Sequence, residues 1–305
     1  IKGEPMNKRS KIKIGKEKKK WSMFSVIAVT FLSIYALSLV LALLWALLSS
    51  LKSRFDFREN PFSLPKNWRF DNYMKAFGEL FVGIETATGS RNVYMPELLF
   101  NTVVYALGST IFSVMSPCLT AYIVAKYKFK GRNVIYATVI VTMLLPIVGS
   151  LPSSMILMKA IGFYDNLIGI WITKGSFLGM NFLIFYACFK SFSWDYAEAA
   201  FIDGASNFRV MVQINLPLAK TTILAMALLA FVGYWNEYET QLIYLPSMPS
   251  LAYGLFQFQF SVSTVASSVT IQLAGCMIVA IPIFILYMIF KDMLIGNIAV
   301  GGIKG

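Results

Sequence analysis

The sequence predicts an all-α membrane protein that crosses a lipid bilayer six times, for three reasons. Of its 305 residues, 57% are apolar, whereas soluble domains have about 45–50%. Only 14% are charged, and these cluster, which leaves long uncharged runs. Each run has roughly the 20 residues that a helix needs to cross the hydrocarbon core. A lone strand cannot satisfy its backbone groups in lipid, so the runs are expected to be helices.

Six runs meet this length criterion and are the predicted spans: 22–48, 98–125, 134–156, 167–189, 221–244 and 269–290. The first is about 28 residues long and lacks an A-x-A cleavage site, so we expect an anchor that stays in place rather than a signal peptide. The chain begins with Ile1, and Met6 is a candidate start residue. Pro146 and Pro152 predict bends in the third span, and Pro282 predicts one in the sixth.

Lys and Arg residues set the predicted orientation. Eighteen of the 27 fall on the same side as the N-terminus, nine of them within residues 1–20. Basic residues accumulate in cytoplasmic loops, so both termini are predicted to be cytoplasmic in a multi-pass protein of the cell membrane. The expected organisation is a basic tail (1–20), a transmembrane domain (21–290) and a cytoplasmic tail (291–305), with an outer loop at 49–97 and an inner loop at 190–220.

The outer segments contain signals for short elements. The outer loop is long enough for surface helices, and 67–73 is either an amphipathic turn on a membrane or partner surface or a solvated linker. In the second outer segment a helix is expected to end at Gly162 and restart with Asp165 or Asn166 as its cap. The third, 245–268, has no charged residue and favours a re-entrant or surface helix.

The inner loop at 190–220 predicts two short helices. Ser193 is a candidate N-cap for a helix from Trp194 to Asp203. Gly204 is expected to end that helix because glycine readily takes a positive φ. A second helix is expected over 207–214, and Pro217 is expected to begin the fifth span, where its missing N–H costs nothing. The sequence of the loop therefore predicts a bent, rigid element that a soluble partner can bind.

The same loop carries a spaced motif. Glu198-Ala199-Ala200 is followed after three residues by Gly204, and then after nine residues by Ile214-x-Leu216-Pro217. This pattern is similar to the cytoplasmic "EAA" loop of permease subunits of ATP-binding-cassette importers. The resemblance implies the type I importer permease fold and an ATPase-coupling role for Glu198, Ala199, Ala200, Asp203, Gly204, Ile214, Leu216 and Pro217. It also implies that ATP is hydrolysed on separate subunits, so this chain is expected to be no enzyme and to need no cofactor.

Further stretches narrow the resemblance to one branch of these importers. They are Ala121-Tyr122 ahead of a basic loop at 129–132, Trp235-Asn236-Glu237-Tyr238, and the terminal stretch 297–305. Together they resemble the smaller permease subunit of the maltose importer family, which implies import of a carbohydrate, with an oligosaccharide expected. The implied partners are a second homologous permease, two ATPase subunits, membrane lipid and an extracytoplasmic solute-binding protein.

The resemblance also suggests where those partners lie. Residues 244–268 would reach toward the binding protein, with Pro246, Met248 and Tyr253 as candidate contacts, and the tail at 291–305 would lie between the ATPases. Relatives hold the sugar mainly on the other permease, so a sugar site on this chain is an open question.

Polar residues at membrane depth are the candidates for a translocation pathway. Acids inside a span are costly unless they face a cavity or a partner. The candidates are Trp235, Asn236, Glu237, Tyr238 and Asn181, with Asn101, Glu239 and Gln272 as further polar groups. Three readings stay open: lining of the pathway, hydrogen bonds at a subunit interface, and simple surface exposure.

Other functions fit the sequence less well. An importer of a non-sugar solute is the nearest alternative. An ion-driven transporter would predict broken helices, paired intramembrane charges and inverted repeats, and no internal repeat is visible. The chain has no His and no G-x-x-x-x-G-K-[ST] loop, which argues against an embedded enzyme or a nucleotide site. Cys118, Cys188 and Cys276 lie singly in apolar runs, so no metal or disulfide site is expected.

Overall fold

The computed structural model describes residues 22–86, 89–145, 149–260 and 268–300, and the side chains of these except for residues 86 and 291–300. The predicted basic tail at 1–20, Pro146 and the last five residues lie outside this part. Two compact units are present, 1–46 and 47–305. The first is described by α1 (Met23–Ser50), an apolar helix whose side chains are mostly exposed up to residue 46 and whose last turn belongs to the second unit.

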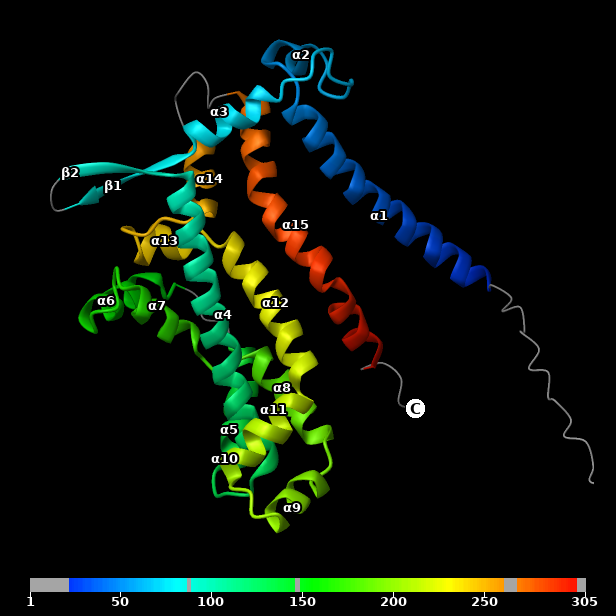
Figure 1. The fold of residues 1–305 in the computed structure, drawn as a ribbon, viewed down its shortest axis with the longest axis vertical. Helices are drawn as coiled ribbons and strands as arrows, with labels where there is room; N and C mark the ends of the chain where they lie inside the picture. The colour runs from blue at the N-terminus through cyan, green and yellow to red at the C-terminus, as the bar shows by residue number, and fades with distance from the viewer. Residues whose placement is uncertain (1–21, 87–88, 146–148, 261–267, 301–305) are drawn as a thin grey trace, which may run out of the picture. The chain divides into compact units, whose positions relative to one another are not determined.

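The second unit is built around α4 (Met95–Lys126), which lies against α7, α8, α12 and α14 (Figure 1). Tyr105 and Tyr122 of α4 are among the largest fully buried side chains. The remaining helices, in chain order, are α2 (Arg54–Glu59), α3 (Asp71–Glu79), α5 (Arg132–Leu144), α6 (Leu151–Ala160), α7 (Leu167–Lys174), α8 (Met180–Ser191), α9 (Asp195–Ile202), α10 (Asn207–Val210), a π-helical turn (Met211–Asn215), α11 (Leu216–Leu218), α12 (Lys220–Asn236), α13 (Glu239–Tyr244), α14 (Leu251–Gln259) and α15 (Val269–Val300).

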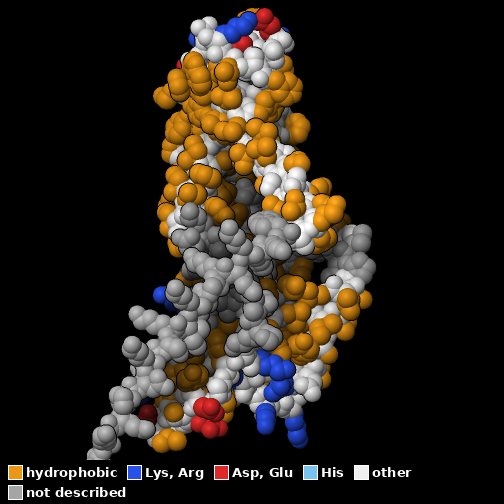
Figure 2. Space-filling model, turned by 90° about the vertical axis from the view of Figure 1, so that its right-hand side faces the viewer, with side chains coloured by type: hydrophobic (Ala, Val, Ile, Leu, Met, Phe, Trp, Pro, Cys, Tyr) orange, Lys and Arg blue, Asp and Glu red, His pale blue; other side chains and the backbone are white. Residues whose placement is uncertain are grey.

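Long apolar helices confirm that the protein belongs in a membrane. In the described residues, α1, α4 and 269–290 of α15 are long and apolar enough to cross one, and α10–α11 with α12 make a fourth such unit bent by 71°. Hydrophobic side chains make up most of the coloured surface drawn in Figure 2. An apolar surface of this kind is expected where lipid surrounds a protein.

Three predicted spans are not continuous helices, which corrects the sequence reading. The run 134–156 is divided between α5 and α6, 167–189 between α7 and α8, and 221–244 between α12 and α13. The first break contains Gly149 at φ +72°, a conformation that favours glycine. The second contains Gly175 and Gly179. Summed hydropathy measures how apolar a run is, and glycine and serine inside it can still end a helix.

The outer loop contains α2 and α3, as expected, and also a β-hairpin that the all-α prediction missed. Strands β1 (Phe81–Thr86) and β2 (Gly89–Tyr94) are antiparallel, with Phe81 opposite Tyr94 and Thr86 opposite Gly89. Val82, Ile84 and Val93 are buried and belong to one cluster with Leu98 of α4 and Leu251 of α14. The alternation of Val82 and Ile84 with exposed neighbours is the period-two pattern of a half-buried strand.

A buried lysine organises the start of this loop. Lys52 is fully buried, and its ammonium donates to the carbonyls of Asn60 (2.8 Å) and Pro61 (3.2 Å) and to the Ser63 hydroxyl (3.2 Å). The Asn72 amide donates to the carbonyls of Ser50 (2.7 Å) and Lys52 (2.8 Å). These bonds hold α2 and α3 close to the end of α1's last turn.

A glycine sets the distance between α4 and α7. A Cβ atom built on Gly108 would lie 2.0 Å from Cε2 of the Trp171 indole, far inside van der Waals contact. Gly233 of α12 offers a comparison, because a Cβ there would meet nothing within 4 Å.

We expect Gly108→Ala to lower the apparent unfolding midpoint in detergent, since an overpacked methyl group costs roughly 1–3 kcal/mol. The matched control, Gly233→Ala, also adds one methyl group inside a helix, and alanine's better helix propensity should leave stability unchanged or raised by up to about 1 kcal/mol. Equal midpoints for both variants would contradict the close contact of α4 with α7.

Candidate functional site

The start of α9 differs slightly from the expected cap. The helix covers Asp195–Ile202, and its first turn bonds to the Trp194 carbonyl, which accepts from the N–H groups of Ala197 (2.8 Å) and Glu198 (3.1 Å). Trp194 is therefore at the N-cap position, which has no side-chain cap. The Ser193 hydroxyl accepts from Asp195 N (3.2 Å), so it supports the turn just before the helix instead of capping it.

The end of α9 is as predicted. Gly204 has φ +80°, and its N–H donates to the Phe201 carbonyl (3.0 Å) while Ala205 N donates to the Ala200 carbonyl (2.9 Å). This is the left-handed termination for which glycine carries no Cβ penalty.

The second helix of the loop is interrupted. Ser206 caps α10 by accepting from Arg209 N (3.3 Å), and the chain then widens into the π-helical turn Met211–Asn215. The buried Asn215 amide donates to the Val210 carbonyl (3.4 Å) within that turn. The fifth span begins at Lys220 after the 71° bend, not at Pro217 as predicted, because Pro217 lies in the short α11 on the other side of the bend.

The motif residues divide into an exposed and a half-buried set. Glu198, Ala199, Asp203, Gly204 and Pro217 are exposed, whereas Ala200, Ile214 and Leu216 are half-buried. The half-buried side chains fasten the loop to the rest of the chain, and the exposed ones are open to a partner.

Sequence reasoning missed an apolar surface on this loop. Ile202 and Phe208 expose 86% and 70% of their surface, and Tyr196 exposes 59%. Exposed apolar groups beside polar ones often mark a protein contact. The available signal was the presence of large apolar residues in a loop that was otherwise predicted to lie in water.

A polar cluster closes the break between α12 and α13, and Glu237 is its centre. Its carboxylate accepts from Tyr105 OH (2.7 Å), Lys174 Nζ (2.8 Å) and Thr240 Oγ1 (2.6 Å). Lys174 Nζ also donates to Thr240 Oγ1 (3.1 Å) and lies 5.3 Å from the centre of the Tyr234 ring. The cluster thus joins α4, α7 and the α12–α13 junction through a charged pair whose side chains are only 21% and 26% exposed.

The other pathway candidates do not converge on Glu237. Trp235 is 3% exposed and donates to the Val279 carbonyl of α15 (3.3 Å), and Asn181 of α8 donates to the Ser113 carbonyl of α4 (3.4 Å). Tyr238 stacks on Phe256 of α14, with ring centroids 4.5 Å apart. Asn236 is exposed and bonds to Val232 of its own helix (2.8 Å). Sequence reasoning missed Tyr105 and Lys174 as the partners of Glu237, because only the fold brings them together.

Of the candidate binding-protein contacts, Pro246 and Met248 lie on the loop between α13 and α14, and Tyr253 lies in the first turn of α14. Pro246, Met248 and Tyr253 are all half-buried. Asp165 accepts from Ser247 N (3.1 Å) and Ser247 Oγ (2.7 Å), which ties this loop to the turn before α7. That turn follows the prediction: Gly162 has φ +74° after the end of α6, and the Asn166 side chain caps α7.

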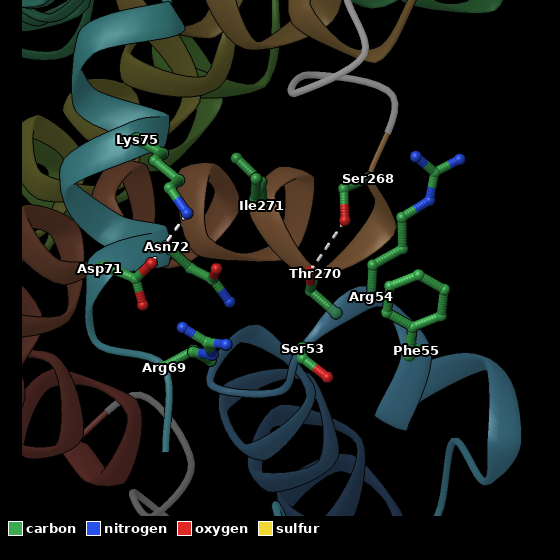
Figure 3. Close-up of a pocket in the computed structure, with 10 residues that line it drawn as sticks. All are labelled: Ser53, Arg54, Phe55, Arg69, Asp71, Asn72, Lys75, Ser268, Thr270 and Ile271. Carbon is green, nitrogen blue, oxygen red and sulfur yellow. Dashed lines mark hydrogen bonds and ion pairs between the residues drawn. The ribbon is translucent and has the colours of Figure 1, made fainter. Parts of the chain in front are cut away.

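A hollow of about 290 Å³ lies between α2, α3 and the start of α15 (Figure 3). Arg54, Arg69 and Lys75 line it. Lys75 pairs with Asp71 (2.8 Å), and its hydrogen bond lowers the pKa of that carboxyl below the usual value. Within the described residues neither arginine forms an ion pair, so two guanidinium groups remain open at this surface.

We expect Lys174→Met and Glu237→Gln each to lower the unfolding midpoint, because each leaves a half-buried partner unsatisfied at a cost of roughly 1–3 kcal/mol. The double variant should lose less than the sum, with a coupling free energy on the order of 0.5–3 kcal/mol. Thermal unfolding of the four proteins in one detergent measures the cycle.

The exposed pair Lys75–Asp71 is the control for this cycle. Lys75→Met and Asp71→Asn remove an i,i+4 pair that is about half solvent-exposed, where screening leaves little net gain. If the changes in unfolding free energy at Lys174 and Glu237 are additive and no larger than those at the control pair, the cluster does not stabilise the break between α12 and α13.

Comparison with known proteins gives consistent matches. The family model of binding-protein-dependent transport system inner membrane components matches residues 118–299, which include the whole inner loop. A diacetylchitobiose uptake system permease protein of Streptomyces coelicolor is 25% identical over 91% of this chain and 88% of its own. A probable starch degradation products transport system permease protein of Thermoanaerobacterium thermosulfurigenes is 29% identical over 88% and 95%.

The fold also has a counterpart among solved structures. A chain of a bacterial ABC transporter involved in import of the acidic polysaccharide alginate superposes with a TM-score of 0.70, at 24% identity, over 88% of this chain and 95% of that one. At this identity the likeness concerns the fold alone.

Proposed function

The chain belongs to the family of binding-protein-dependent transport system inner membrane components, and we propose that it is a permease subunit of an ATP-driven importer that moves a carbohydrate, an oligosaccharide in particular, across the cell membrane. The observation that carries the proposal is the EAA loop, folded as an exposed helix α9 that ends at Gly204. The names of its relatives, uptake systems for diacetylchitobiose and for starch degradation products, support the substrate class.

Two features of the structure also fit an ion-driven transporter, namely broken helices and the intramembrane pair Lys174–Glu237. The family match over residues 118–299 favours the ATP-driven importer instead. In this reading the pair is structural, since Tyr105 and Thr240 occupy the remaining positions around the Glu237 carboxylate.

The coupling mechanism follows from how the loop is attached. In the proposed orientation, with both termini cytoplasmic, a cleft of an ATPase subunit receives α9 through Glu198, Ala199 and the exposed Ile202. Force on α9 passes through α10, the π-helical turn and α11 to the bend at Ala219, and then to α12, which packs against α4 and α15. Closure of the ATPase pair would turn α12 and shut the inner side of the pathway, and ATP hydrolysis would reset it.

The proposed assembly contains a second homologous permease, two ATPase subunits and an extracytoplasmic solute-binding protein. Asn236 and Tyr238 are the proposed pathway residues of this chain, because Asn236 is exposed and Tyr238 offers a stacked aromatic pair with Phe256. The burial of Trp235 favours a packing role against α15. Pro246, Met248 and Tyr253 remain the proposed contacts with the binding protein.

We expect the tagged full chain, purified in mild detergent, to retain one second permease and two ATPase copies by intact mass. Glu198→Lys and Ile202→Asp should each reduce the retained ATPase at least tenfold. The first reverses the charge of a contact residue, and the second puts a charge in place of an exposed apolar side chain. Gly204→Asp should do the same by forcing a side chain into a φ of +80°. Glu85→Lys, an equal charge reversal on the exposed side of β1, is the control and should retain the ATPase. Recovery of the wild-type chain alone under every condition would refute the importer assignment.

The substrate class has its own test. We expect reconstituted complex with its binding protein to show ATPase stimulation by oligosaccharides and not by amino acids or phosphate, since stacked aromatic and amide groups suit sugar rings and hydroxyls. Asn236→Ala should reduce sugar-stimulated ATPase activity severalfold while Asn133→Ala, a matched change outside the proposed pathway, leaves it unchanged. Stimulation by a non-sugar solute alone would contradict the carbohydrate proposal and leave the importer assignment intact.

A further inference from the structure

A basic hollow of about 630 Å³ lies where α4 and α8 end and the segment leading to α9 begins. Its lining comes from the turn after α4, the start of α5, the end of α8 and the first part of the inner loop at 190–220. The lining residues are Ala125, Lys126, Tyr127, Lys128, Arg132, Lys190, Phe192, Trp194 and Glu198. Of these residues, the proposed transport mechanism uses only Glu198, as a contact with the ATPase.

The charges around the hollow are unbalanced. Four cationic side chains face one carboxylate, that of Glu198, and in the described part of the chain none of the five forms an ion pair. Lys126 Nζ donates to the Phe192 carbonyl (2.8 Å) and lies 5.9 Å from the ring centres of both Phe192 and Trp194. The cation nearest the protein interior is thus held in place by neutral groups. Gathered like charges repel one another, and an anion among them would relieve that repulsion.

The surroundings of the hollow are those of a membrane interface. Tyr127 and Trp194 line it, and the rings of these two residue types, which carry a polar O–H or N–H group, collect at the level of lipid headgroups. The next turns of the same helices are apolar and exposed: Ile123 of α4 exposes 47% of its surface and Val134 of α5 exposes 68%. At the end of the second unit that carries α9 in Figure 1, Figure 2 shows Lys and Arg side chains, with Asp and Glu side chains and hydrophobic surface close by.

We propose that this hollow binds the phosphate headgroup of an anionic phospholipid from the leaflet on the α9 side. Lys128, Arg132 and Lys190 would contact the phosphate oxygens as charge-assisted donors, and the acyl chains would lie on the exposed apolar face of α5. Basic pockets at the ends of membrane helices are suited to such headgroups. The inference goes beyond the proposed function, since it needs only that α4, α5 and α8 meet a membrane surface here.

A lipid in this position would stabilise the first part of the inner loop, just before α9. Phe192 and Trp194 lead directly into α9, and both contact Lys126. A bound phosphate would therefore neutralise the charges around the segment from which the ATPase contact projects.

The test measures lipid retention by the purified full-length complex. The complex is titrated with dioleoyl phosphatidylglycerol or with dioleoyl phosphatidylcholine, and native mass spectrometry measures how much of each lipid stays bound. We expect the wild type to retain the anionic lipid at least tenfold better than the zwitterionic one. The triple variant Lys128→Gln/Arg132→Gln/Lys190→Gln should lose this preference. The matched control, Lys130→Gln/Arg209→Gln/Lys220→Gln, removes the same charge from exposed residues outside the hollow and should keep it.

Several results would overturn the proposal. They are unchanged lipid retention by the first triple variant, equal losses in both triple variants, and no preference for the anionic lipid. Displacement of the lipid by millimolar inorganic phosphate would identify a site for a free anion instead. Loss of the ATPase from the first triple variant with unchanged lipid retention would identify a protein contact. If that variant does not elute as a monodisperse complex, the single variant Lys190→Gln, at an exposed residue, replaces it. We expect Lys190→Gln to retain the anionic lipid at least threefold more weakly than the wild type. Unchanged retention by Lys190→Gln would overturn the proposal.

Discussion

Where water cannot reach it, a backbone N–H or C=O group that leaves its helix must find another partner inside the protein, because nothing else replaces the lost bond. This requirement governs where the helices of the second unit can stop. The loop between α13 and α14 meets it with side chains of α4: the Asn101 amide donates to the Pro249 carbonyl (3.0 Å), and Thr102 Oγ1 accepts from Leu251 N (2.7 Å). Both α4 residues are buried. The central helix therefore serves as the source of hydrogen-bond partners for its neighbours' irregular segments.

The charged cluster meets the corresponding requirement for half-buried side chains at the junction of α12 with α13. A carboxylate with three donors and an ammonium with two acceptors can be held away from water at an acceptable cost, which a lone charge cannot. Because these groups come from α4, α7 and the junction itself, the break is fixed in position. Asn101, which the sequence offered as a pathway or an interface residue, belongs to this internal network.

The sequence analysis succeeded where the signal is local. Apolar length marked α1, α4 and α15, Gly204 marked the end of α9, Asn166 marked the start of α7, and the spacing of the EAA motif marked the family. It failed where the signal depends on partners. Tyr105 and Lys174 lie 132 and 63 residues from Glu237, so no pattern in the chain links them. The hairpin was not predicted, because its local signal is short: Val82 and Ile84 alternate with exposed neighbours within a single strand of six residues.

The π-helical turn at Met211–Asn215 has a consequence for the length of the coupling loop. Such a turn accommodates one residue more than an α-helical turn does, and in an α-helix each residue advances by about 100° around the axis, at 3.6 residues per turn. Loss of a single residue here would be absorbed, because the wide turn would become ordinary α-helix and the segments on either side would keep their phase. Loss of a second residue would rotate those segments relative to one another by about 100°. The interval between Gly204 and Ile214 therefore tolerates a change of one residue in length at this turn and no more.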